Sequence, residues 1–169
     1  VGVSNDRRRG VNLPDQFSAS RANDLFRGDR TVVDWGNTVR LPALGGFATD
    51  GALGFGYNFA HETASTAAGN APFRSIVNAS QDNHAGFVNL QYRVLERLDV
   101  SAGGRVDSTT GFGTTPTYRL GAVYALPEVG ARLRAAVGSG FAAPSLFQRF
   151  GIIGSGFRGN PDLRPERST

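Results

Sequence analysis

The sequence has no cysteine, no methionine and no lysine, and it contains only two histidines. Without cysteine, neither a disulfide framework nor a thiolate metal site can form. His61 and His84 lack the H-E-x-x-H spacing of a catalytic zinc site, and we interpret both as surface residues at strand ends. We therefore expect no metal and no cofactor.

Long apolar runs are also missing. The longest unbroken stretch, residues 122–126, has five residues, whereas a helix that spans a membrane needs about 20. A helical membrane protein is excluded. The sequence also lacks a nucleophile-elbow motif, a phosphate-binding loop and a recognisable nucleic-acid-binding motif. We therefore expect neither an enzyme nor a nucleic-acid-binding protein.

The dominant pattern that the sequence does contain is alternation of apolar residues with polar residues or glycine. It recurs in six segments of about the length of a strand that crosses a bilayer, and a partial strand begins at Val1 and Val3. The six segments are residues 31–41, 47–60, 87–94, 98–107, 117–126 and 131–138. This pattern predicts an all-β, antiparallel fold.

Short and long links alternate between these segments. The short links are residues 42–46, 95–97 and 127–130, and the long polar links are residues 7–29, 62–82, 108–115 and the run after Phe141. In outer-membrane barrels the short turns are periplasmic and the long loops are extracellular. The alternation therefore gives each predicted strand a direction.

The two faces of the predicted strands also differ in a way that favours a transmembrane barrel. The polar face carries charges at mid-strand, and the apolar face carries aromatic residues toward strand ends, which is typical of a wet lumen and an aromatic girdle. The charges are Asp34, Arg119 and Arg134, and the aromatics are Tyr57, Phe59, Tyr92 and Tyr118. A soluble β-sandwich binding module shows similar alternation and stays an alternative.

Two runs near the C-terminus resemble the barrel signature of TonB-dependent receptors. The first run contains Gly140, Phe141, Ala143, Pro144, Ser145 and Leu146, and the second contains Gly159, Asn160, Pro161, Leu163, Pro165 and Glu166. Segments 30–38, 83–92 and 95–105 resemble wall strands of the cobalamin and siderophore branch of that family. The prolines predict an ordered loop and not a strand. We expect Glu166 and Arg167 to anchor this loop to neighbouring charges of the lumen.

This resemblance implies a late barrel region of a receptor in the outer membrane of a Gram-negative bacterium. Residues 1–169 would be a partial β-barrel domain with six or seven strands, because a plugged transporter needs about 22. The imported nutrient would be cobalamin, slightly favoured, or a ferric siderophore. The TonB complex would act through an N-terminal plug that this sequence lacks. A passive porin-like or structural barrel stays the alternative, but it would not be expected to carry the proline-rich signature.

Candidate ligand contacts come from aromatic and arginine residues of the long links. These are Phe17, Phe26, Phe73, Arg74, Phe112, Phe147, Arg149 and Phe150. Loop packing is the other interpretation of each. We interpret the run of three arginines at residues 7–9 as a loop cluster that faces outer-membrane lipid, where it would meet lipopolysaccharide phosphates rather than nucleic acid.

Overall fold

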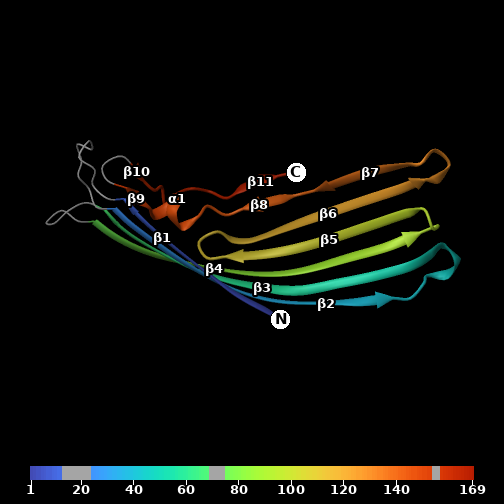
Figure 1. The fold of residues 1–169 in the computed structure, drawn as a ribbon, viewed down its shortest axis with the longest axis horizontal. Coiled ribbons are helices and arrows are strands. Elements are labelled where there is room, and N and C mark those ends of the chain that lie inside the picture. The colour runs from blue at the N-terminus through green and yellow to red at the C-terminus, as the bar shows by residue number, and fades with distance from the viewer. Residues whose placement is uncertain (13–23, 69–74, 154–156) are drawn as a thin grey trace.

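The computed structural model describes residues 1–12, 24–68, 75–153 and 157–169. Its main body is one antiparallel sheet of seven strands, and each strand pairs with its neighbour in the sequence (Figure 1). The strands are β1 (Gly2–Asn12), β2 (Asp24–Leu41), β3 (Ala48–Ala68), β4 (Ser75–Val94), β5 (Leu98–Thr109), β6 (Gly113–Leu126) and β7 (Ala131–Gly138). In the described part of the chain, no helix is long and apolar enough to cross a membrane.

The three predicted short links are confirmed, and all lie at one end of the sheet, which we call the lower end (Figure 1, right). Two of them contain 3-10 turns, η1 (Gly45–Phe47) and η2 (Pro127–Val129). Gly130 closes η2 with a φ of 62°, which a residue with a side chain adopts less easily. The η2 turn is joined to the β4–β5 link by an ion pair of 2.6 Å between Arg97 Nη1 and Glu128 Oε1. A backbone hydrogen bond of its own turn, helped by Arg97, holds the pKa of the Glu128 carboxyl below its ordinary value.

At the opposite, upper end the predicted long links are mostly strand. β1 and β2 continue through much of 7–29, and β3 and β4 continue through most of 62–82. The long link predicted at 108–115 is wrong, because only residues 110–112 separate β5 from β6. The upper extensions of β1, β2, β3 and β4 carry polar residues on both faces. The hydrophobic alternation therefore stops there, while backbone pairing continues.

Two interpretations of individual residues change with these longer strands. His61 and His84 lie in the middle of β3 and β4, not at strand ends. The arginines at 7–9 lie inside β1, paired with β2, and not in a loop.

The register confirms the two predicted faces of the sheet. Asp34 pairs with Asn58, and Trp35 pairs with Tyr57, so that polar and apolar residues fall on opposite sides. The polar face includes Arg30, Asp34, Arg40, Glu62, Gln81, Asn83, Gln91, Asp107, Arg119 and Arg134. The apolar face includes Trp35, Val39, Leu53, Phe55, Tyr57, Phe59, Val88, Leu90, Leu120 and Leu133.

The apolar face is not covered by a second layer in the described residues. Trp35 is 44% exposed, Leu120 48% and Leu133 62%, and no large side chain is fully buried. A soluble β-sandwich would instead bring two apolar faces together. An uncovered apolar face of this extent fits contact with a bilayer.

Aromatic residues mark two levels of the apolar face. Toward the upper end lie Trp35, Phe55, Tyr57, Phe59 and Tyr118, and toward the lower end lie Tyr92 and Tyr124. The register places Tyr124 level with Ala48, nine residues below Tyr57. Nine residues span about 30 Å along a strand, and a tilted strand needs roughly 9 to 11 residues to cross a bilayer. Tyr57 and Phe59 are not near the end of β3, because β3 continues above this level.

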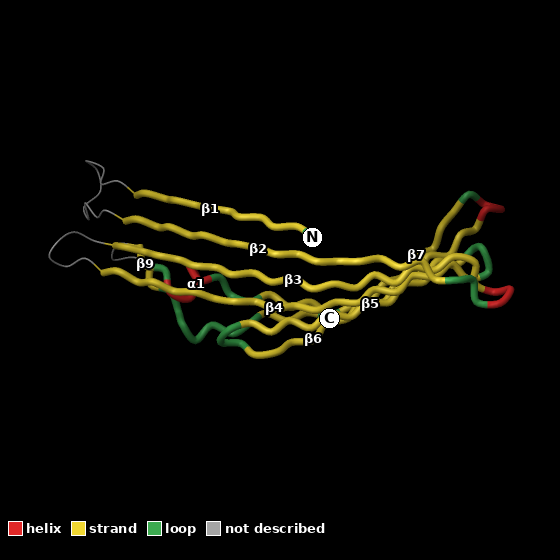
Figure 2. The backbone as a smooth tube through the Cα atoms, turned by 90° about the horizontal axis from the view of Figure 1, so that it is seen from below, coloured by secondary structure: helices red, strands yellow, loops and turns green. Residues whose placement is uncertain are grey.

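The C-terminal run is not the plain loop that its prolines predict. It contains β8 (Gly140–Ala142), α1 (Leu146–Phe150), β9 (Ile152–Ile153), β10 (Phe157–Arg158) and β11 (Glu166–Ser168). β11 pairs with β8, and β10 pairs with β9. We call residues 140–153 and 157–168 the C-terminal strap. Figures 1 and 2 show that its outer part, with α1, reaches the upper end beside β3 and β4.

Gly56 provides a test of close packing on the polar face. A Cβ atom at Gly56 would lie 2.6 Å from Phe87 Cζ and would clash with the Trp35 carbonyl oxygen, whereas a Cβ at Gly86 would have no atom within 4 Å. We expect Gly56→Ala to destabilise the full-length protein by about 1–3 kcal/mol. The measurement is the urea concentration at half unfolding, with Gly86→Ala as the control. Equal midpoints for the two variants would contradict this packing.

Candidate functional site

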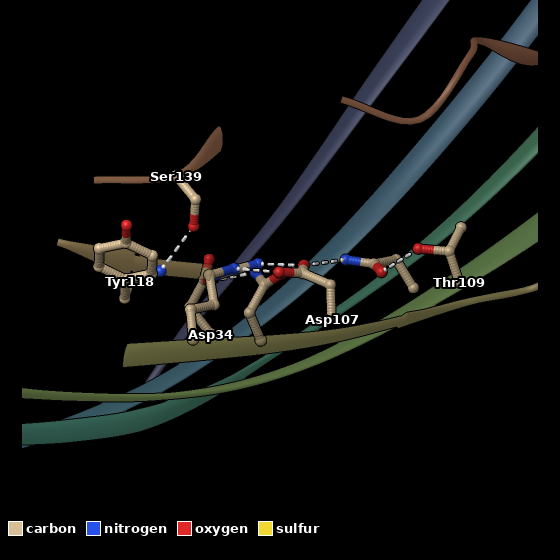
Figure 3. A network of polar contacts seen from close by, with 8 residues as sticks. Asp34, Asp107, Thr109, Tyr118 and Ser139 are labelled. Carbon is tan, nitrogen blue, oxygen red and sulfur yellow. Dashed lines mark hydrogen bonds and ion pairs between the residues drawn. The ribbon is translucent and has the colours of Figure 1, made fainter. Parts of the chain in front are cut away.

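The C-terminal strap lies against the upper part of the polar face. It starts from β7, yet α1 contacts β3 and β4 in the middle of the sheet. Ser139 holds the start of the strap against β6, because its Oγ accepts a hydrogen bond of 3.0 Å from the Tyr118 backbone N–H (Figure 3). The residues buried in this region are mostly polar and small: Ala60, Gln81, Asp107, Thr109 and Thr115.

A polar network from β4 and β5 forms the base of this region (Figure 3). Arg105 donates two hydrogen bonds to Asp107, at 2.8 and 2.9 Å. Asn83 Nδ2 donates to the same carboxylate at 3.1 Å, and Asn83 Oδ1 accepts from the Thr109 hydroxyl at 2.7 Å. Asp107 is only 7% exposed, and a carboxylate buried to this degree requires such partners.

A cavity of about 340 Å³ separates this network from the strap. Its walls include Arg30, Glu62, Gln81 and Asp107 from the sheet and Pro144 from the strap. Arg30 and Glu62 form an ion pair of 3.2 Å. The buried Gln81 Oε1 has no hydrogen-bond partner among the described residues. The cavity is polar and large enough to hold water.

Arg149 connects the strap to the turn between β5 and β6. Its guanidinium lies 4.6 Å from the centre of the Phe112 ring and 4.8 Å from that of Phe150. Arg149 Nε and Nη2 both donate to the Pro161 carbonyl oxygen at 3.4 Å. Such cation–π contacts contribute about 0.5–1 kcal/mol each at exposed sites. Arg149 therefore holds three separate segments together.

Phe147 anchors the other side of α1. Its ring meets Phe26 of β2 edge-on at 5.1 Å and stacks on Phe157 of β10 at 5.2 Å. Leu146 beside it is only 4% exposed. The helix starts at Ser145, whose hydroxyl accepts from the Gln148 N–H at 3.2 Å, while Gln148 Oε1 accepts from the Ser145 N–H at 2.9 Å. This capping box follows the S-x-x-Q pattern of the sequence, which favours the start of a helix. The prolines of the run led us to predict a loop instead.

The structure brings most of the sequence-predicted ligand residues into two neighbouring groups. Phe112, Arg149 and Phe150 form one group, and Phe26 and Phe147 belong to the other. Phe112, Phe147, Arg149 and Phe150 are all half-buried, so each keeps part of its surface open. The remaining candidates Phe17, Phe73 and Arg74 lie outside the described residues.

The two signature runs form the two legs of the strap. β8 carries Gly140 and Phe141, and it pairs with β11, which begins at Glu166. Between the two legs, the Gly159 N–H donates to the Gly151 carbonyl at 2.8 Å. The Asn160 side chain accepts from the Asp162 N–H at 3.0 Å, which is the turn expected of Asn-Pro-Asp.

The predicted anchoring of the strap by charge pairs is not what the structure contains. Arg167 reaches the Thr115 hydroxyl at 3.5 Å, and Glu166 forms no ion pair within the described residues. The sequence alone also missed Asn83, Arg105 and Asp107, whose positions on the polar face were predictable but whose mutual contacts were not.

Comparison with known proteins supports the architecture. The family model described as "TonB dependent receptor-like, beta-barrel" matches residues 2–169. Two strains of Vibrio cholerae serotype O1, El Tor Inaba N16961 and Classical Ogawa 395, each have an "iron-regulated outer membrane virulence protein" that is 29% identical over 137 residues. That alignment covers 78% of this chain and 21% of the relative, so the chain spans about a fifth of the relative's length.

Solved structures agree on the fold. The RagAB peptide importer in its closed-closed state superposes with a TM-score of 0.62 at 12% identity, covering 98% of this chain and 24% of that chain. A structure of the RagAB peptide transporter gives a TM-score of 0.58 at the same identity and coverage. The location is the outer membrane of a Gram-negative bacterium. The chain belongs to the TonB-dependent receptor-like β-barrel family.

Proposed function

We propose that this chain forms part of the wall, and a strap inside the lumen, of a receptor that imports a ferric chelate with energy from the TonB complex. The observation that carries the proposal is the strap itself, which is held by the two family signature runs against the polar face. A simple pore needs an open lumen, whereas this segment occupies the upper lumen and encloses buried polar groups. We also propose that the receptor has an N-terminal plug, through which the TonB complex would act.

The arrangement of the sheet agrees with a wall section. β1 pairs only with β2, and β7 only with β6, among the described residues. Because a barrel must close its edges, we propose that further strands complete a wall of about 22 strands. The short turns at the lower end would then face the periplasm, and the strap and the upper links would face the outside.

A ferric siderophore is our preferred ligand class, and cobalamin is the competing one. The sequence resemblance slightly favoured cobalamin, but the Vibrio cholerae relative is named as iron-regulated. We weigh the named relative more heavily, because the resemblance covered both ligands.

The half-buried residues of the strap are our candidates for ligand contact. Phe112, Phe147, Arg149 and Phe150 are fixed by packing against each other or against neighbouring strands. A surface held in place before binding loses less conformational entropy when the ligand arrives. Phe73 and Arg74 stay candidates from the sequence alone.

Uptake by cells that produce the full-length receptor tests the proposed function. We expect accumulation of radioactive iron from a ferric siderophore, and we expect it to stop when TonB is deleted or the proton motive force is collapsed. Radiolabelled cyanocobalamin is the parallel substrate. Uptake that persists without TonB would reject the receptor function in favour of a passive pore. Energised uptake of cobalamin alone would reject only the ligand class.

Replacement of Arg149 tests whether the strap shapes the ligand surface. Arg149→Met keeps an unbranched side chain but removes both cation–π contacts and the two hydrogen bonds to Pro161. We expect a loss of about 1–3 kcal/mol in local stability, seen as faster proteolysis of the strap, together with weaker ligand binding to the full-length receptor. Arg164→Met is the matched control, because Arg164 is exposed. Faster proteolysis with unchanged ligand affinity would reduce Arg149 to a packing residue.

A further inference from the structure

The three consecutive arginines of β1 point to different sides of the wall. Arg8 lies on the polar face, where it forms an ion pair of 3.0 Å with Asp6. Arg7 and Arg9 alternate with it and therefore lie on the outer side of the wall, the side that carries the apolar residues lower down.

The register then gathers positive charge on that outer side. Arg7 pairs with Asp29, and Arg9 lies directly opposite Arg27. Asp29 is shared between Arg7 at 2.6 Å and Arg27 at 3.3 Å, and no carboxylate among the described residues pairs with Arg9. Like charges directly opposite each other on neighbouring strands are destabilising. This cluster, Arg7, Arg9 and Arg27 around Asp29, therefore has an excess of positive charge that an external anion would neutralise.

A polar groove adjoins the arginine cluster. Its volume is about 460 Å³, and it is lined by Arg27 and Asp29 together with hydroxyl and amide side chains of β3 and β4. Those side chains are Thr63, Ser65, Asn78 and Ser80. Hydroxyl and amide groups donate and accept hydrogen bonds, as the hydroxyl groups of a saccharide do. Charge and hydrogen-bonding groups together match a phosphorylated saccharide.

The height of the groove places it at the surface of the membrane. Thr63 lies four residues above Phe59, the highest aromatic residue of the upper level on β3. Four residues correspond to about 13 Å along the strand and roughly 10 Å in height, just outside the apolar band. His61 and Asp82 lie between Phe59 and the groove, and His61 Nδ1 is 2.6 Å from Asp82 Oδ1. Among the described residues of β3 and β4, the outer face has no other acidic side chain and no arginine near this level.

We propose that Arg7, Arg9 and Arg27, with the groove of Thr63, Ser65, Asn78 and Ser80, bind the phosphorylated saccharide head group of lipopolysaccharide. The head group is the anion that lies at this height in the outer leaflet, and its acyl chains would continue down the apolar face beside Trp35 and Phe59. This site lies outside the barrel, so it does not depend on the ligand that the lumen takes up.

Titration of fluorescent, deep-rough lipopolysaccharide into the full-length receptor in a non-ionic detergent tests the site. Changing both Arg9→Gln and Arg27→Gln should weaken binding by about thirtyfold, since each basic residue near an anionic surface contributes about a factor of five. Arg8→Gln is the matched control from the same run of arginines, and its affinity should equal that of the unchanged receptor. Arg9→Lys with Arg27→Lys keeps the charge and should retain most of the binding.

Two further measurements identify the source of the anion. Dephosphorylated lipopolysaccharide should bind the unchanged receptor about as weakly as intact lipopolysaccharide binds the double glutamine variant. Inorganic phosphate at the same phosphate concentration should not compete, because it offers no saccharide and no acyl chains. Effective competition by inorganic phosphate, or an equal loss of affinity in Arg8→Gln, would overturn the proposal. If the glutamine variant does not fold, loss of binding in the lysine variant at low salt would overturn it as well.

Discussion

The pairing of β2 with β3 places Asp34 opposite Asn58 and Trp35 opposite Tyr57, and the same two-residue period runs through all seven strands. A shift by one residue would turn Arg40 or Arg134 toward the bilayer and Trp35 toward the lumen. An arginine on the lipid side near the midplane costs about 2–4 kcal/mol. The separation of faces by this register is therefore the constraint on which the lumen, the girdle and the outer surface all depend.

The strap packs against small side chains and a polar network on the polar face. Small side chains such as Ala60 leave space above the sheet. Asn83, Arg105 and Asp107 form hydrogen bonds with one another, so their polar groups have partners beneath the strap. The strap is in turn fixed by contacts that need little apolar area, namely the capping box of Ser145 and the contacts of Arg149. This wall therefore has almost no conventional core, and its order rests on backbone pairing and on polar networks.

The strands that face the bilayer could be predicted from the sequence because lipid on one side and water on the other enforce strict alternation. Their upper extensions could not, because they lie above the apolar band, where the outer face, with Thr63 and Ser80, and the opposite face, toward the strap, both have polar surroundings, so no alternation is required. The short helix could have been predicted from Ser145 and Gln148, but the nearby prolines led us to predict a loop. In fact, a proline directly before the cap does not interrupt a helix that starts after it.

The contacts of the candidate site depended on information that no local pattern carries. Phe26 and Phe147 are 121 positions apart in the chain, and their contact exists only because the strap folds back over the sheet. By itself, the sequence determined the all-β architecture, the two faces, the lower turns and the family signature, because each depends on residues close together in the chain. Only the tertiary structure decided which side each arginine of residues 7–9 faces, where the strap lies, and which side chains meet there. Those outcomes depend on strand register and on chain reversal, and both are set by pairing between distant segments.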